Sequence, residues 1–272
     1  MIFFTTCKIN IGLNIVARRP DGYHDIETLM VPVDWHDILE IVPAKGDTST
    51  LTVLGRQVDC QPEDNLVMKA YRALNAVTPL PPVDIYLEKI VPDQAGLGGG
   101  SADASFTLTG LNEMFRLGMS KEQLADIAAT LGADCPLFVY NRPMLATGTG
   151  TTLREVDIDL THYYIVIVKP DIKVPTREAY AGVTPAPWPT PLADMLSDIV
   201  AAAPANDFEA SVFDRHPLLQ TIKQELTEMG AVYASMSGSG SAVFGMFDDA
   251  DKARRAAESM KCHGITRICR PV

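Results

Sequence analysis

The sequence predicts an α+β protein of two domains, and two features carry this prediction. A glycine-rich loop near residue 98 follows a strand pattern and runs directly into a helix pattern. After residue 162 the pattern becomes strand, helix, strand, strand, helix and strand, which is the order of a split βαβ unit. The 272 residues suffice for two modest domains. We expect the composition change near 153–161 to divide them into domains 1–156 and 157–272.

The first domain is expected to begin with sheet. Apolar residues alternate with polar ones over 9–15, the period of a half-buried strand, and a Pro-Asp-Gly turn follows within 18–23. Further strands are predicted at 26–33, 38–42, 51–54 and 83–90. Helices are predicted at 65–77, capped at Asp64 or Asn65, at 101–115, and from a Ser120–Gln123 capping box to Leu131.

The second domain carries the split βαβ pattern. We predict that Gly230 ends a helix in the C′ position. The predicted strands are 163–168, 231–236, 242–247 and 264–269. The predicted helices are 192–202, 218–229 and 249–262.

The composition excludes several classes of protein. Lys and Arg number 23 against 34 Asp and Glu, a formal charge of −11, which argues against binding nucleic acid or an anionic membrane. The five scattered cysteines have no zinc-ligand spacing, so we expect reduced thiols and no metal site in the protein itself. The amino terminus lacks the features of a signal peptide, which predicts a cytoplasmic protein.

The glycine-rich loop is the strongest functional signal. Four glycines occupy five positions, 96–100, so backbone N–H groups can approach an anion closely, and the helix that follows favours phosphate at its N-terminus. The alternative is a tight turn that needs glycine only for positive φ. The segment lacks the Gly-Lys-Ser/Thr of a P-loop, and Ser101 stands where the third Gly of a Rossmann motif belongs. The protein-kinase motifs are also absent.

Several segments together resemble the GHMP kinase superfamily. Within it they resemble the family of 4-diphosphocytidyl-2-C-methyl-D-erythritol kinases, nearly end to end. The matching segments are Lys8–Asn10, Arg19–His24, Glu63–Leu66, Gly96–Ser101, Leu131–Pro136, Pro175–Thr176 and Ser237–Ser241. The resemblance implies a ribosomal protein S5 domain 2-like N-terminal nucleotide-binding domain and a ferredoxin-like C-terminal domain. The chain departs from the family pattern at Gln94, usually Gly, and at Ala102, usually a second Ser, which puts nucleotide affinity in question.

The resemblance also implies catalytic and ATP-binding residues. Its catalytic Lys and Asp match Lys8 and Asp134, where the carboxylate would orient the substrate hydroxyl and the ammonium would neutralise developing charge. Without the resemblance, Lys8 could equally extend from a strand edge into solvent, and Asp134 could equally cap a helix or form a turn. The ATP-binding residues implied are Pro92, Ala95, Gly96, Leu97, Gly98, Gly99, Gly100 and Ser101.

A second group of residues is expected to bind a cytidine diphosphate substrate. In the resembling family a His reads the cytosine edge and two aromatic rings stack on the base, which corresponds to His24 with Tyr23 and Tyr180. The alternatives are a solvent-exposed turn histidine for His24 and core packing for Tyr180. Asn10 could bind substrate or face solvent, and the loop 237–241 could form a backbone anion site or a flexible hairpin turn. The substrate-binding residues predicted are Asn10, Tyr23, His24, Thr176, Tyr180, Gly238, Ser239 and Gly240.

The function implied is ATP-dependent phosphorylation, with Mg²⁺, of the 2-hydroxyl of the methylerythritol group in the non-mevalonate isoprenoid pathway. The alternatives are a homoserine or mevalonate type of GHMP kinase, against which Tyr23 and His24 speak, and a catalytically silent nucleotide-binding module, which Lys8 and Asp134 oppose. We expect no nucleic-acid or membrane partner, and a monomer or homodimer.

Overall fold

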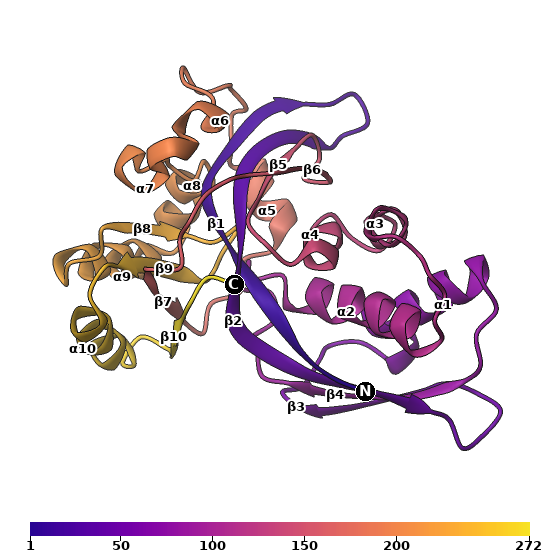
Figure 1. Cartoon of the computed structure of the whole chain (residues 1–272). Helices are drawn as coiled ribbons and strands as arrows, with labels where there is room; N and C mark the ends of the chain where they lie inside the picture. Colours follow the sequence, from indigo (N-terminus) through magenta and orange to yellow (C-terminus); the bar gives the residue numbers. More distant parts are fainter. The chain divides into compact units, whose positions relative to one another are not determined.

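A computed structural model describes the whole chain, residues 1–272 (Figure 1). The chain forms two compact units. Unit 1 comprises residues 1–7, 35–93 and 98–142, and unit 2 comprises residues 8–34, 94–97 and 143–272. The first two strands, β1 (Ile2–Arg18) and β2 (His24–Pro43), contribute to both units. The division at residue 156 stays a prediction, because a compact unit and a sequence domain need not coincide.

Unit 1 is a sheet with helices packed over it. Strand β4 (Val83–Lys89) pairs parallel with β3 (Thr50–Gly55) and antiparallel with the second half of β2. The helices lie over the sheet (Figure 1). The inward side chains of β4 contribute Val83, Ile85 and Leu87 to one apolar core, together with side chains from the helices. The helices are η1 (Pro62–Asp64), α1 (Leu66–Val77), α2 (Gly99–Met114), α3 (Lys121–Ala129) and α4 (Cys135–Tyr140).

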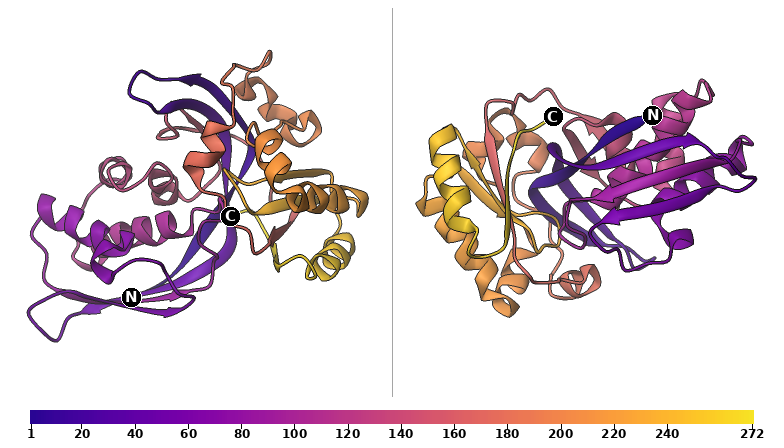
Figure 2. Two further views of the ribbon diagram at one scale, coloured as in Figure 1. Left: turned by 180° about the vertical axis from the view of Figure 1, so that it is seen from behind. Right: turned by 90° about the horizontal axis from the view of Figure 1, so that it is seen from below.

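Unit 2 contains the first half of β2, which pairs with β5 (Met144–Thr147), and β6 (Thr152–Glu155), which pairs with β5. It also contains a four-stranded antiparallel sheet in the order β10-β7-β9-β8. The strands of this sheet are β7 (Tyr164–Lys169), β8 (Tyr233–Met236), β9 (Val243–Phe247) and β10 (Ile265–Cys269). Helices α9 (Pro217–Glu228) and α10 (Ala250–Met260) pack on it and bury one core (Figure 2). The remaining helices are α5 (Thr176–Ala181), α6 (Leu192–Met195), η2 (Leu196–Asp198), α7 (Ile199–Ala202) and α8 (Glu209–Arg215).

Most of the predicted elements are confirmed. The antiparallel sheet has the predicted split βαβ order, Asn65 caps α1, Ser120 and Gln123 form the capping box of α3, and Gly230 follows the C-cap of α9 with φ +95°. The short elements α4, β5, β6 and α8 escape the sequence patterns, because each has too few residues to show a period.

Three predictions are wrong. The strands predicted at 26–33 and 38–42 are one continuous strand, β2. The strand predicted to be half-buried is buried on both sides, since every residue from Thr5 to Ile15 is buried. Its alternating polar side chains therefore face other parts of the protein instead of solvent. The helix predicted at 192–202 is broken into α6, η2 and α7. None of the helices is both long and apolar enough to cross a membrane.

Candidate active site

Lys8 lies on β1 in unit 2, with only 3% of its side chain exposed. Its Nζ donates to Oδ1 of Asn10 at 2.6 Å and to the backbone carbonyl of Gly96 at 2.9 Å. Burial therefore rules out a lysine that extends into solvent, and it also rules out the solvent-facing alternative for Asn10, which is 2% exposed. Burying an ammonium group costs free energy unless oxygen atoms accept hydrogen bonds from it. The two acceptors at Lys8 therefore stabilise its charged form.

Residues 94–97 of the glycine loop pack directly on the loop between β8 and β9. A Cβ built on Gly96, whose φ is +75°, would lie 1.9 Å from the carbonyl oxygen of Ser237. Ser237 Oγ donates to the carbonyl of Gly96 at 2.9 Å, the same oxygen that accepts from Lys8. Only glycine permits both this φ and this approach of two backbones.

The loop 237–241 is largely buried within unit 2. Ser237 and Ser241 are fully buried, and Gly238 lies beside Asn10, since a Cβ on it would be 3.4 Å from Asn10 Oδ1. Ser239 Oγ lies 3.3 Å from Thr176 Oγ1 at the start of α5. The loop is the hairpin connection between the antiparallel strands β8 and β9, and its predicted residues are brought together with Lys8 and Asn10. Its role as a backbone anion site stays a prediction.

The buried side chain of Asn206 explains what holds this loop. Its Nδ2 donates to the carbonyls of Met236 at 2.8 Å and Gly238 at 2.9 Å, and its Oδ1 accepts from the N–H of Phe208. Sequence analysis missed Asn206, because a lone Asn before a short helix has no distinguishing spacing. Polar residues also follow it at Asp207 and Glu209, so the local composition gives no signal for Asn206.

In unit 1 the rest of the glycine loop forms the N-terminus of α2. Gly98 is the N-cap with φ +68°, and the first turn contains no acidic residue. The N–H groups at this end have no partner within the helix and carry the positive end of its dipole, so they favour an anion. Ser101 in this turn adds a hydroxyl.

Asp134 occupies the N-cap position of α4, and its side chain makes no capping hydrogen bond. Asp134 lies in the turn between α3 and α4, so α4 separates it from the next strand, β5. The helix-cap alternative for its carboxylate does not hold. The segment before α4 lies near the start of α2, since a Cβ on Gly132 would be 3.9 Å from Ser101 Oγ. Asp134 and the N-terminus of α2 thus belong to one region of unit 1.

A buried ionic cluster in unit 1 contacts the chain on both sides of the glycine loop. Lys89 Nζ bridges the carboxylates of Asp37 and Asp103, the latter at 2.8 Å, and Thr5 Oγ1 donates to Asp103 at 2.6 Å. Asp37 Oδ1 also accepts from the backbone N–H of Val91 at 2.8 Å, just before the loop, while Asp103 lies in α2 after it. Burial raises the pKa of the Asp103 carboxyl to about 6, against the lowering effect of Lys89.

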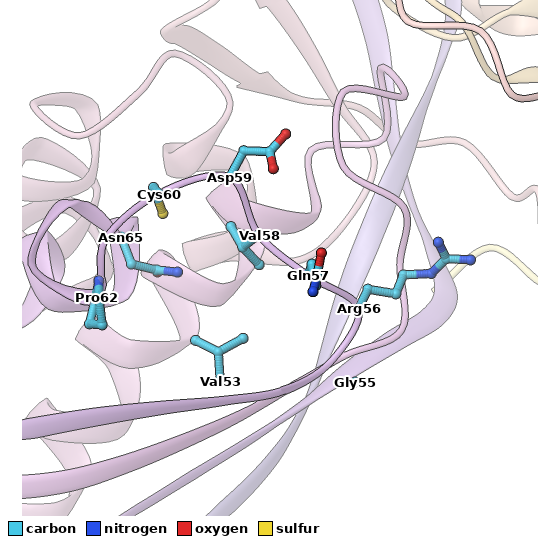
Figure 3. Close-up of a pocket in the computed structure, with 9 residues that line it drawn as sticks. All are labelled: Val53, Gly55, Arg56, Gln57, Val58, Asp59, Cys60, Pro62 and Asn65. Carbon is cyan, nitrogen blue, oxygen red and sulfur yellow. The ribbon is translucent and has the colours of Figure 1, made fainter.

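A cavity of about 430 Å³ opens in unit 1 beside the segment that joins β3 to α1 (Figure 3). Asn65 extends from the start of α1 toward the space enclosed by Val53 and Val58 (Figure 3). The next residue, Leu66, approaches the glycine loop, since a Cβ on Gly100 would be 3.8 Å from its Cδ1. The lining residues are Val53, Gly55, Arg56, Gln57, Val58, Asp59, Cys60, Pro62 and Asn65. Sequence analysis missed this cavity, because only Asn65 belongs to a recognised segment.

The predicted base-binding residues are brought together in part. The rings of His24 and Tyr180 stack in unit 2, with centroids 4.7 Å apart and planes 22° apart. Tyr180 also packs edge-on against the buried Phe208, so its core-packing alternative is confirmed, and its stacking on a base stays a prediction. Tyr23 is 67% exposed and lies in the turn before β2.

Comparisons with known proteins agree with this geometry. Residues 65–142 match the GHMP kinases N terminal domain, and residues 192–266 match the GHMP kinases C terminal domain. The chain belongs to the GHMP kinases. This GHMP kinase is 49% identical over 251 residues to the 4-diphosphocytidyl-2-C-methyl-D-erythritol kinase of Parabacteroides distasonis, covering 91% of the chain and 92% of the relative. It is 43% identical to the kinase of the same name from Cytophaga hutchinsonii, over 91% and 93% of the two chains.

Solved structures extend the comparison. A crystal structure of 4-(cytidine 5'-diphospho)-2C-methyl-D-erythritol kinase superposes with a TM-score of 0.86 at 32% identity, over 100% of this GHMP kinase and 99% of that chain. A homoserine kinase from Cytophaga hutchinsonii has a TM-score of 0.72 at 18% identity, over 97% and 94% of the two chains. The second likeness shows the fold alone. The family membership makes the chain a small-molecule kinase.

Gln94 and Ala102 are the two positions at which the sequence analysis expects this GHMP kinase to depart from the family pattern. Gln94 adopts the left-handed region with φ +48°, which costs a non-glycine residue roughly 1–2 kcal/mol. Ala102 is fully buried in the first turn of α2, which leaves the hydroxyl of Ser101 in this turn.

Proposed function

We propose that this chain transfers the γ-phosphate of ATP to the 2-hydroxyl of 4-diphosphocytidyl-2-C-methyl-D-erythritol. The names of the relatives supply the substrate, and the stacked rings of His24 and Tyr180 are the observation that supports it. Aromatic rings can stack on a nucleobase, and neither homoserine nor mevalonate contains a nucleobase. In unit 2 these rings occur together with the buried ammonium of Lys8.

The proposed chemistry depends on positioning and on charge, as phosphoryl transfer generally does. Lys8 stabilises negative charge on the substrate oxygen and on the transferred group. Asp134, which caps no helix, orients the substrate hydroxyl and accepts its proton. The N–H groups at the start of α2 bind nucleotide phosphates. The loop 237–241 donates further backbone N–H groups to anionic parts of the substrates.

Mg²⁺ fits this proposal as a companion of the nucleotide. The chain has no group of three or more His, Cys, Asp or Glu residues that could hold a metal ion. Mg²⁺ bound mainly by phosphate oxygens needs only one or two protein oxygens, and Asp134 and Ser101 in unit 1 offer a carboxylate and a hydroxyl. When bound, the ion would neutralise phosphate charge.

The cavity of unit 1 is proposed to hold the base of ATP. Its lining residue Asn65 directly precedes Leu66, whose side chain lies near Gly100 at the start of α2. The cavity has apolar walls from Val53 and Val58, and it offers the polar groups of Asn65 and Gln57 for the base edge. The negative charge of the whole protein makes local donors necessary for binding an anionic nucleotide, and the α2 N-terminus supplies them.

Product analysis tests the substrate. The purified chain is incubated with MgATP in three parallel reactions, which contain the cytidine diphosphate substrate, mevalonate and homoserine respectively. We expect phosphorylation of the first and none of the others above background. Phosphorylation of homoserine or mevalonate at a comparable rate contradicts the proposal.

His24→Ala is expected to lower kcat/KM for the cytidine substrate by about 5- to 100-fold, because a buried base edge loses its partner. The KM for ATP should stay the same. Exchanging cytosine for uracil should weaken the unaltered enzyme similarly and the variant much less. His162→Ala is the matched control, since it also removes a histidine ring that packs on a tyrosine, Tyr163. Equal sensitivity of both enzymes to the base exchange excludes His24 as the reader of the base.

Alkylation of Cys60 is expected to block nucleotide binding. Cys60 and Cys262 carry exposed thiols, and only Cys60 lines the cavity. A maleimide group at Cys60 should lower ATP affinity at least about 10-fold, because its bulk fills space that the base needs. Saturating ATP should slow labelling of Cys60 and leave Cys262 unchanged, as measured by mass spectrometry of the peptides. Labelling of both thiols at ATP-independent rates contradicts the placement of the base.

A further inference from the structure

We propose that Thr28 is a positioning residue for Lys8, and that it acts by fixing which way the side-chain amide of Asn10 is turned. The proposal rests on the role of Lys8 in the proposed function. All residues concerned lie in unit 2. Asn10 is 2% exposed and Thr28 is fully buried, so water does not compete for these groups.

The direction of the hydrogen bonds follows from what each atom can do. Thr28 Oγ1 lies 2.6 Å from the carbonyl oxygen of Gly12, which can only accept, so the single hydroxyl proton of Thr28 is donated there. Toward Asn10 the hydroxyl then offers only lone pairs. The atom of Asn10 that faces it at 3.0 Å must be the donor Nδ2.

This fixes the other end of the amide. With Nδ2 turned to Thr28, Oδ1 of Asn10 faces Lys8 Nζ at 2.6 Å and accepts from the ammonium. The reversed amide would place its NH₂ group against the ammonium, a donor against a donor. Thr28 thus converts an amide with two possible orientations into a fixed acceptor, and Lys8 acquires one defined position.

The backbone on both sides of Gly12 is held in place. The N–H of Leu13, which shares its peptide unit with the carbonyl of Gly12, donates to the carbonyl of Ala205 at 2.9 Å. The N–H of Gly12 donates to the hydroxyl of Tyr233 at 3.1 Å, and that hydroxyl donates to the carbonyl of Pro204 at 2.8 Å. Burial raises the pKa of Tyr233 to about 12, so this hydroxyl keeps its proton over the working pH range. The chain of donors therefore starts at a rigid point and ends at the ammonium.

Thr28→Val tests the proposal, since valine keeps the shape and removes the hydroxyl. We expect kcat to fall about 10- to 100-fold, because a displaced charge fails to meet the transferred group, while the KM for ATP stays within about threefold. Thr28→Ser keeps the hydroxyl and should keep kcat within about threefold. Thr107→Val is the matched control, as Thr107 is also fully buried and its hydroxyl donates to a backbone carbonyl, that of Asp103.

The decisive measurement repeats Thr28→Val in the Asn10→Asp background. A carboxylate presents an acceptor oxygen to Lys8 in either orientation. In that background the orientation of the side chain at position 10 therefore no longer depends on Thr28. The loss of kcat caused by Thr28→Val should shrink to less than about threefold in that background. An equal fold loss in both backgrounds, or a loss equal to that of Thr107→Val, overturns the proposal.

Failure of the proposed function and failure of the Thr28→Val variant to fold are each distinguished from failure of this proposal. If the unaltered chain does not phosphorylate the cytidine substrate, the proposed function fails, and the same ratios are measured with the acceptor that it does phosphorylate. If Thr28→Val does not fold, NMR of the unaltered protein decides. The side-chain amide protons of Asn10 should exchange slowly with water, and rapid exchange overturns the proposal.

Discussion

Lys8→Met is expected to lower kcat by at least about 100-fold while the protein stays folded and binds ATP. Methionine matches the length of lysine and suits a position that is 3% exposed. The ammonium is lost together with its bonds to Asn10 and to the carbonyl of Gly96. The carbonyl of Gly96 still accepts from Ser237 Oγ, so only Oδ1 of Asn10 loses its partner. Removing a buried charge offsets part of that cost, so the change in stability should be small beside the change in rate.

The control for this variant is Lys169→Met. Lys169 is also a buried strand lysine in unit 2, and its Nζ donates to the carbonyls of Pro170 and Ile172 at 2.8 Å. We expect it to change thermal stability and to leave kcat within about threefold. An unchanged kcat in Lys8→Met, with only the substrate KM raised, would show that Lys8 binds substrate and does not act in the transition state.

Asp134→Asn is expected to lower kcat at least about 100-fold as well, since the amide cannot accept the proton of the substrate hydroxyl. The change keeps the size of the side chain, and it removes no helix cap, because Asp134 makes no capping bond to α4. Thermal melting, and titration with ATP in the absence of Mg²⁺, should therefore match those of the unaltered protein.

Asp249→Asn serves as its control. Asp249 is the N-cap of α10, where its carboxylate accepts from the N–H of Lys252 at 2.7 Å, and asparagine caps about as well. This variant should retain both stability and rate. Retention of more than about a third of the rate by Asp134→Asn contradicts a proton-accepting role.

The sequence allowed the prediction of those parts of the fold that have a period or a cap. The helix at Asn65 and the capping box at Ser120 are local patterns, so they survive in the structure unchanged. The burial of β1 on both faces could not be predicted, because it depends on contacts with segments far away in the chain. The alternating pattern around Lys8 and Asn10 is the same in the sequence of a half-exposed strand and in that of a buried strand.

The candidate site divides in the same way. The glycine loop has a motif, and its helix N-terminus was expected. The cavity at Val53–Asn65 and the clamp at Asn206 have no motif, because they arise when separate segments fold together. Thr28 belongs to this second kind, as its role depends on a hydrogen bond to a residue 18 positions away.

The complete burial of β1 between Thr5 and Ile15 has a consequence for motion. Amide protons of a segment buried on both sides exchange through large-scale unfolding, whereas an exposed connecting segment opens locally at little cost. Lys8 and Asn10 should therefore lie among the most protected amides of the chain. The segment around Arg56–Cys60, which is mostly exposed, should exchange within the earliest time points. Lys8 and Asn10 would then lie on one of the least mobile strands, whereas the cavity proposed for the base would be lined by a segment that opens locally at little cost.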